Sequence, residues 1–269
     1  MPLPALLPAL AALTAAQGEA IELALPHEDG LIAVHADWDG RRLPLVRDEG
    51  QWLTVIGIDL DRAPGSHELV VERDYGPAGT ERETGEVVVA AKEFPTTRLT
   101  VEPGYVELSP DNQQRAAREA AEIDAIYATL TPERYWSEPF AVPIPGTTGG
   151  SNFGHRRIFN DQPRNPHAGA DLSATTGTPI LAANRGRVVL AKELFFSGNA
   201  VFLDHGQGVY SVYLHLSEIG VEPGQMLERG ERLGLAGATG RVTGPHLHWG
   251  VRVLDARVDP FSLLLLGSD

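Results

Sequence analysis

The first third of the chain alternates short runs rich in β-branched, aliphatic and aromatic residues with turn residues. Such runs cover residues 31–34, 52–58, 69–72 and 86–90, and turn sequences such as Asp37-Trp38-Asp39-Gly40 lie between them. Short strands separated by turns at these intervals indicate a small sandwich of β-sheets. We therefore predict an N-terminal β-sandwich domain over residues 17–95, with a role in positioning or substrate recognition, or as a structural cap.

The pattern changes to a helical period after Ser109-Pro110. Apolar residues recur at three- and four-residue spacing between residues 115 and 130, which predicts a helix. Ser109 is the expected N-cap and Pro110 the first helical residue. Thr131-Pro132-Glu133 repeats this capping pattern and predicts a second short helix. Residues 96–150 are accordingly interpreted as a helical connector that ends in a linker rich in proline and glycine.

Residues 151–269 show strand patterns again, and their polar positions carry the candidate chemistry. On a strand, alternate residues share a face, so His246 and His248 point into one space while Leu247 points into the core. His167 and Asp171 lie four residues apart, a spacing that places both side chains on one face of a strand or on one turn of a helix. Imidazoles and a carboxylate that converge predict a site for a divalent metal ion.

The composition restricts the kind of metal site. The chain has no cysteine, so a structural zinc site built from thiolates is excluded, and an open site with three protein ligands and a water molecule is favoured. Five groups are available where three suffice, and the two in excess would be free for proton transfer: His167, Asp171, His215, His246 and His248.

From about residue 151 to residue 260 the chain resembles the catalytic domain of the lysostaphin and LytM type zinc endopeptidases, which cut peptide cross-links in bacterial cell walls. The resemblance depends on the order and spacing of many short pieces. They are Phe153-Gly154, Arg156-Arg157, His167-x-x-x-Asp171, Gly177-Thr178-Pro179, Gly198-Asn199, Asp204-His205-Gly206, Tyr213-Leu214-His215-Leu216, Gly237-x-Thr239-Gly240-Arg241, Gly244-Pro245-His246-Leu247-His248 and Val258-Asp259-Pro260.

The resemblance implies a fold and a set of roles. The protein would be mainly β, with an antiparallel, barrel-sandwich-like peptidase domain over residues 151–269 and short connecting helices. One Zn²⁺ per chain would be bound by His167, Asp171 and His248, and His215 and His246 would assist catalysis without binding the metal. The expected reaction is hydrolysis of peptidoglycan cross-links by metal-activated water.

Three further residues are candidates for substrate binding. Arg157 could bind a carboxylate of the stem peptide or form a salt bridge within a loop. Asn199 could orient a ligand or belong to a turn. Tyr213 precedes His215 by two residues, so on a regular strand it would share a face with that histidine and could act as a further donor, or it could only pack in the core. For His205, in a turn-like Asp-His-Gly sequence, a structural role is favoured.

Alternative interpretations remain at this point. Two Gly-rich hairpin patterns in the C-terminal half resemble lipoyl and biotinyl carrier domains, but Lys192, the lysine of this half, lies outside the expected context for modification. Two histidines and a carboxylate also form the facial triad of non-haem iron oxygenases, usually with a different spacing. A regulator of cell wall hydrolysis that retains the fold without turnover is the main functional alternative.

Charge and the N-terminal residues set the expected location and partners. The net charge of −14 argues against nucleic acid as a partner. Residues 1–16 are apolar and too short for a membrane span, which favours a signal peptide, with small residues before Gln17 for cleavage, and export to the periplasm or cell envelope. The missing basic residues leave an N-terminal arm of the folded protein as the alternative. No stable membrane insertion is expected, and the protein is expected to act as a monomer on the peptides of peptidoglycan.

Overall fold

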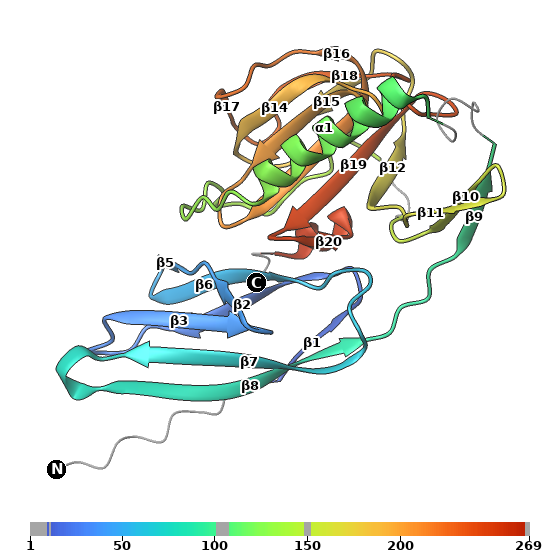
Figure 1. The fold of residues 1–269 in the computed structure, drawn as a ribbon. Helices are drawn as coiled ribbons and strands as arrows, with labels where there is room; N and C mark the ends of the chain where they lie inside the picture. Colours follow the sequence, from blue (N-terminus) through green and yellow to red (C-terminus); the bar gives the residue numbers. More distant parts are fainter. Residues whose placement is uncertain (1–9, 11, 101–107, 148–151, 267–269) are drawn as a thin grey trace.

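The computed structural model describes residues 10, 12–100, 108–147 and 152–266, and it is mainly β, as the sequence predicts (Figure 1). Two β-rich parts, one from each half of the chain, are connected by strand β9 and helix α1 (Figure 1). No helix in the described ranges is both long enough and apolar enough to cross a membrane.

The N-terminal part consists of two sheets that pack on each other. One has the strand order β1-β8-β7-β3-β4 and the other β2-β6-β5. The strands are β1 (Leu13–Ala16), β2 (Ala20–Pro26), β3 (Ala33–Trp38), β4 (Arg41–Leu43), β5 (Val46–Asp48), β6 (Gln51–Gly57), β7 (Gly65–Asp74) and β8 (Thr80–Ala90), with a short 3-10 helix η1 (Gly76–Ala78) before β8. Leu25 and Ile56 from one sheet meet Val71 and Val87 from the other in a shared core. The expected small sandwich is confirmed, and its driving force is the burial of these alternating apolar side chains.

The proposed signal peptide lies mostly on residues 1–9 and 11, outside the described residues. Its last four residues form β1, which pairs with β8 in parallel from Leu13 opposite Val87 to Ala16 opposite Ala90. Ala15 is buried in the sandwich core. Cleavage after Ala16 would remove a paired strand, and the assignment of a signal peptide stays a prediction.

The C-terminal part is built around a larger sheet with the order β12-β19-β16-β15-β14-β17, while β18 pairs with both β13 and β16. Its strands are β12 (Gly169–Ser173), β13 (Pro179–Leu181), β14 (Gly186–Leu194), β15 (Gly198–Asp204), β16 (Val209–Ile219), β17 (Met226–Leu227), β18 (Arg232–Ala236), β19 (His246–Val253) and β20 (Ala256–Val258), followed by the 3-10 helix η3 (Pro260–Leu265). The strand pairs described in this sheet are antiparallel, as expected. Trp249 and Tyr213 are fully buried at its centre.

A small third sheet combines residues from both halves of the chain. Strand β9 (Thr96–Leu99) runs parallel to β10 (Arg156–Phe159), which forms a hairpin with β11 (Gln162–Arg164). In Figure 1 this sheet lies beside β12, away from the sandwich. It therefore brings Arg157 and Phe159 close to the segment that carries His167.

Helix α1 (Pro110–Tyr127) begins as predicted, with Ser109 as its N-cap accepting a hydrogen bond from the Asn112 backbone N–H at 3.3 Å. Its last residue, Tyr127, stacks on Phe202 with ring centroids 6.0 Å apart. The predicted second helix at Thr131 is wrong. The Thr131 carbonyl instead accepts the Gln207 N–H at 2.7 Å, because this segment is bound to the turn after β15 in extended form.

Ion pairs and close packing join the two β-rich parts. The Arg257 guanidinium donates to both carboxylate oxygens of Asp59, at 2.9 and 2.6 Å. Burial alone would raise the pKa of Asp59, but the hydrogen bonds from Arg257 outweigh it and lower that pKa. A Cβ on Gly57 would lie 2.7 Å from Val253 Cβ, so the absence of a side chain at Gly57 permits β6 to approach β19 closely.

Candidate active site

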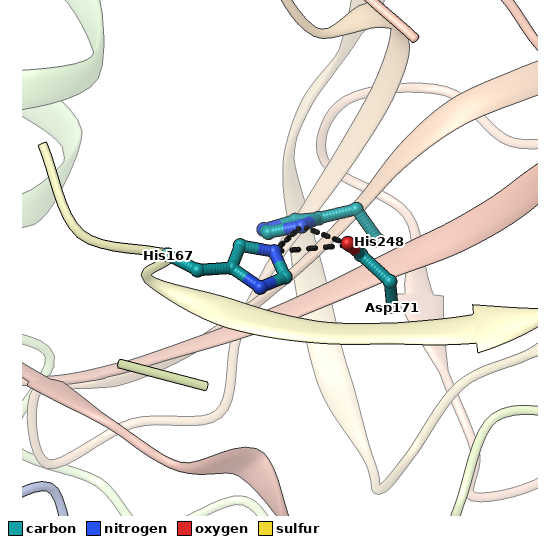
Figure 2. A group of neighbouring side chains, drawn as sticks. All are labelled: His167, Asp171 and His248. Atoms are coloured by element: carbon teal, nitrogen blue, oxygen red, sulfur yellow. Dashed lines mark hydrogen bonds and ion pairs between the residues drawn. The ribbon is translucent and has the colours of Figure 1, made fainter. Parts of the chain in front are cut away.

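Three side chains converge at one edge of the C-terminal sheet: His167, Asp171 and His248. One ligand atom from each lies within 4.8 Å of the others, a group that could hold a metal ion. Nε2 of His167 lies 2.8 Å from Nδ1 of His248, and Oδ1 of Asp171 lies 3.0 and 2.9 Å from these two nitrogens. Figure 2 shows both rings directed at the carboxylate oxygen.

Strand pairing explains why these residues meet. Asp171 on β12 lies directly opposite His248 on β19, and directly opposed residues in an antiparallel pair project on the same face. His167 precedes β12 and is 1% exposed. A Cβ on Gly169 would lie 2.6 Å from Nε2 of His248, so the chain between His167 and Asp171 can pass this ring only with glycine there.

His246 lies beside this cluster, as the alternation on β19 predicts. Leu247 is fully buried, which confirms the face assignment. Nε2 of His246 is 3.6 Å from Oδ1 of Asp171, and Nδ1 is 2.8 Å from the Gly244 carbonyl oxygen. Because a carbonyl can only accept, Nδ1 carries the proton in the neutral ring and Nε2 presents its lone pair toward the cluster.

His215 reaches the same space through an irregularity in β16. It is a non-glycine residue with a φ of 66°, a left-handed conformation that is unusual on a strand. β16 pairs with β19 up to Leu214 opposite His248 and then with β18 from Leu216 onward. The ring of His215 lies 5.0 Å from that of His246 between centroids. The break in alternation at His215 therefore turns its side chain toward the cluster.

Of the two roles open to Tyr213, the structure shows packing in the core. Tyr213 is fully buried, and its hydroxyl accepts a hydrogen bond from the Ala183 backbone N–H at 2.8 Å and pairs with the Ser211 hydroxyl at 2.9 Å. On a regular strand Tyr213 and His215 would share a face. The left-handed backbone at His215 breaks that relation, and Tyr213 stays in the core.

The two other substrate-binding candidates have different surroundings. Arg157 donates from Nη2 to Oδ2 of Asp171 at 3.2 Å, so it contacts the cluster directly. Burial lowers the pKa of Arg157, and the Asp171 carboxylate opposes that shift. The backbone N–H of Asn199 donates to Oγ1 of Thr239 at 2.9 Å, and the Thr239 carbonyl lies 2.9 Å from Nδ1 of His215. Substrate contact by either residue stays a prediction.

Asn152 is a site residue that the sequence analysis did not single out. Its Oδ1 accepts the Asp171 backbone N–H at 2.8 Å, and its Nδ2 donates to Asp171 Oδ2 at 3.1 Å. Its carbonyl oxygen lies 3.1 Å from Nδ1 of His167. The sequence feature that could have indicated Asn152 is its position directly before the Phe153-Gly154 motif. Gly154 donates its N–H to the His167 carbonyl at 2.7 Å, so this motif lies beside the cluster.

The electrostatics of the cluster suit a cation. Burial lowers the pKa of His167 to about 4 and that of His215 to about 3. Burial would raise the pKa of Asp171, but hydrogen bonds with His167 and His248 outweigh it and hold that pKa well below the usual range. At neutral pH these two imidazoles are therefore neutral and the carboxylate is charged.

His205 is confirmed as a structural residue. It is fully buried, with Nδ1 2.8 Å from the Arg185 carbonyl oxygen and Nε2 2.7 Å from Oγ of Ser211. Burial lowers its pKa to about 4.

A cavity of about 740 Å³ opens beside the cluster. His167 and His248 both line it, so it leads to the candidate ligands. The described residues that line the rest include Arg157, Phe159, Phe196 and Arg241. We call this cavity the arginine groove.

Comparison with known proteins agrees with this geometry. The model of the family described as "Peptidase family M23" matches residues 165–260. A crystal structure titled "putative peptidase M23 from Pseudomonas aeruginosa" is 33% identical, the alignment covers 93% of this chain and 94% of that one, and the TM-score is 0.68. The chain belongs to peptidase family M23.

Curated relatives resemble the C-terminal half. The peptidoglycan DD-endopeptidase ShyA of Vibrio cholerae is 46% identical over 100 residues, which cover 37% of this chain and 23% of that protein. The DD-carboxypeptidase/endopeptidase Mpg of Neisseria meningitidis is 37% identical over 123 residues, 46% of this chain and 28% of that protein. The matched segment spans about a quarter of the length of these relatives.

Proposed function

We propose that this protein is a zinc-dependent endopeptidase that hydrolyses peptide cross-links of bacterial peptidoglycan. The observation that carries the proposal is the convergence of His167, Asp171 and His248 with two further histidines whose Nδ1 atoms are bound to backbone carbonyls. Two of the relatives are a peptidoglycan DD-endopeptidase and a DD-carboxypeptidase/endopeptidase, which supports the choice of substrate.

The donor set fits zinc. Two imidazole nitrogens and one carboxylate oxygen are typical zinc ligands, and three protein ligands leave positions for water and substrate. The donor atoms lie 2.8, 2.9 and 3.0 Å apart, whereas zinc with bonds of about 2.0 Å needs about 3.3 Å between tetrahedral ligands. Small side-chain movements close this difference.

Residues around the ligands hold them in the form that a metal needs. The Asn152 carbonyl accepts from Nδ1 of His167, which leaves the Nε2 lone pair of that ring directed at the cluster. Asn152 and Arg157 bind Oδ2 of Asp171 and leave Oδ1 toward the two histidines. The ligands are therefore oriented before any metal binds.

A bound zinc ion would supply a Lewis acid that acidifies a water molecule and polarises the scissile carbonyl. His215 and His246 are suited to move the protons of the reaction. Each has Nδ1 fixed on a backbone carbonyl, at 2.9 and 2.8 Å, and therefore presents Nε2 as a base. One accepts a proton from the attacking water, and a protonated imidazole then donates to the leaving amine.

The location and partners follow from the proposed substrate. Peptidoglycan lies outside the cytoplasmic membrane, so the protein would act in the periplasm or cell envelope, as a monomer bound to stem peptides. The N-terminal sandwich would position the peptidase part through contacts such as Arg257 with Asp59.

Digestion of purified peptidoglycan tests the proposal. We expect the zinc-loaded protein to convert cross-linked muropeptide dimers into monomers, detected by mass spectrometry, and a chelator to stop the reaction. If the protein holds one zinc and binds peptidoglycan but releases nothing from any wall type, the regulatory alternative replaces the endopeptidase.

A further inference from the structure

The arginine groove differs in charge from the chain as a whole. The chain carries a net charge of −14, yet the described residues that line this groove include Arg157, Arg164 and Arg241 and no aspartate or glutamate. A cavity lined by one sign of charge attracts the opposite charge locally, even on an acidic protein. The groove is therefore suited to an anionic part of a ligand.

Arg241 is held in this groove by two aromatic rings. Its guanidinium carbon lies 4.4 Å from the ring centroid of Phe196 and 5.2 Å from that of Phe159. Its backbone N–H donates to the Phe196 carbonyl at 2.8 Å. Gly240 before it has a φ of 76°, and a Cβ there would lie 2.6 Å from the same carbonyl oxygen.

This arrangement limits the conformations of a long side chain. Stacking on aromatic rings holds the planar guanidinium in one orientation, and its edge is the part that recognises a carboxylate. Part of the conformational entropy that arginine would lose on binding is already lost in the free protein. The position of Arg241 is therefore prepared for a planar anion.

We propose that the arginine groove binds a free carboxylate of the cross-linked peptide and that Arg241 selects substrates that carry it. This inference rests on the proposed function, because it assigns the groove to the same peptide substrate. In a D-alanyl-diaminopimelate cross-link, the scissile nitrogen is attached to a carbon that also bears a carboxyl group. A bond inside a glycine bridge has no such group.

The position of the groove supports this assignment. His167 and His248 line the same cavity as Arg241. A peptide whose scissile carbonyl lies at the ligand cluster therefore places the neighbouring residue in or beside the groove. The carboxyl group on that residue lies only a few bonds from the reacting carbon, so its charge state affects the reaction directly.

The test pairs one change in the enzyme with one change in the substrate. Two cross-linked muropeptide dimers are compared, one with the carboxyl group beside the scissile nitrogen free and the other with this group amidated. The enzymes are the zinc-loaded wild type, Arg241→Gln, and the control Arg232→Gln, which removes an exposed arginine on β18.

We expect the wild type and Arg232→Gln to cleave the free acid with a kcat/KM about tenfold to a hundredfold higher than the amide, the range for a charged hydrogen bond. Arg241→Gln should lose most of this preference, chiefly through slower cleavage of the acid form, while its zinc content stays at one per chain. Arg241→Lys, which keeps the charge without the planar fork, should retain an intermediate preference and provides a second variant if Arg241→Gln does not fold.

Equal cleavage of the two dimers by the wild type overturns the inference and leaves the proposed function intact. A preference that survives in Arg241→Gln likewise rejects Arg241 as its source. Cleavage of neither dimer by zinc-loaded wild type overturns the proposed function and this inference with it.

Discussion

Asn152 binds Asp171 at two points, accepting its backbone N–H at 2.8 Å and donating to its Oδ2 at 3.1 Å. The same residue binds Nδ1 of His167 through its carbonyl oxygen. One loop residue thus orients two of the three candidate metal ligands, and it does so without pointing a ligand atom at the cluster centre itself.

Asn152→Ala should therefore weaken zinc binding without unfolding the protein. Loss of such an orienting partner typically costs about tenfold to a hundredfold in metal affinity. Competition with a chromophoric chelator measures the affinity, and circular dichroism checks the fold. Unchanged zinc affinity in Asn152→Ala would show that Asp171 does not need this support.

Substitutions should distinguish the metal ligands from the histidines that transfer protons, because only the ligand variants should lose zinc. His248→Ala and Asp171→Ala should lose zinc, whereas His246→Ala should keep it and lose turnover by about a hundredfold to ten-thousandfold, the usual range for general acid–base catalysis. Metal analysis of the purified variants, together with muropeptide hydrolysis, measures both properties. A zinc-free His246→Ala protein would show that the division of roles is wrong.

The left-handed backbone at His215 allows a sharper version of that test. His215→Gly removes the imidazole and places the residue that best tolerates a φ of 66°. We expect full zinc content, a free energy of unfolding at least equal to that of the wild type at neutral pH, and loss of turnover. Full activity in this variant would remove His215 from the mechanism.

Alternation along β19 was sufficient to place His246 and His248 on one face, because a regular strand has a period of two. Alternation along β16 did not place Tyr213 and His215 on one face, because the left-handed backbone at His215 turns that side chain to the opposite face. Asn152 was not predictable because its hydrogen bonds depend on a loop position set by long-range packing. The N-cap of α1 was predictable because capping is local, whereas the segment at Thr131 follows tertiary contacts with Gln207.

Gly169→Ala tests the close approach between β12 and the His248 ring. The new Cβ would lie 2.6 Å from His248 Nε2 and 2.6 Å from the Trp249 carbonyl oxygen. Overpacking of this kind costs about 1–3 kcal/mol, and displacement of the ring should also weaken zinc binding. Urea unfolding and zinc affinity measure the two effects.

Gly220→Ala is the matched control, because its added Cβ would meet its nearest atom, the Leu233 carbonyl oxygen, at 3.4 Å. We expect a change in the free energy of unfolding within about 0.5 kcal/mol. Equal stability and zinc affinity in Gly169→Ala and Gly220→Ala would contradict the packing account.

His205 should make stability depend on pH. Burial lowers its pKa to about 4 in the folded protein, against about 6.5 in an unfolded chain. Between these values the unfolded state binds a proton that the folded state does not, so the free energy of unfolding falls as the pH falls. The contribution is complete above pH 6.5 and decreases by about 2 kcal/mol between pH 7 and pH 5.

Urea unfolding of the metal-free protein at pH 7 and pH 5, compared with His205→Gln, isolates this contribution. The variant lacks the titrating ring and should lose less stability on acidification than the wild type. The same loss in both proteins would assign the pH dependence to other groups, such as His167 and His215, whose pKa values burial also lowers.

If His167, Asp171 and His248 bind the zinc with which this protein cuts peptidoglycan cross-links, metal content and cleavage must rise together. A titration of chelator-treated protein with Zn²⁺, with cleavage of a cross-linked muropeptide dimer measured at each step, tests this proposal. We expect no cleavage without metal, a linear rise that ends at one zinc per chain, and no recovery in His248→Ala. Full cleavage by the metal-free protein, or recovery in His248→Ala at the same zinc concentration, would contradict it.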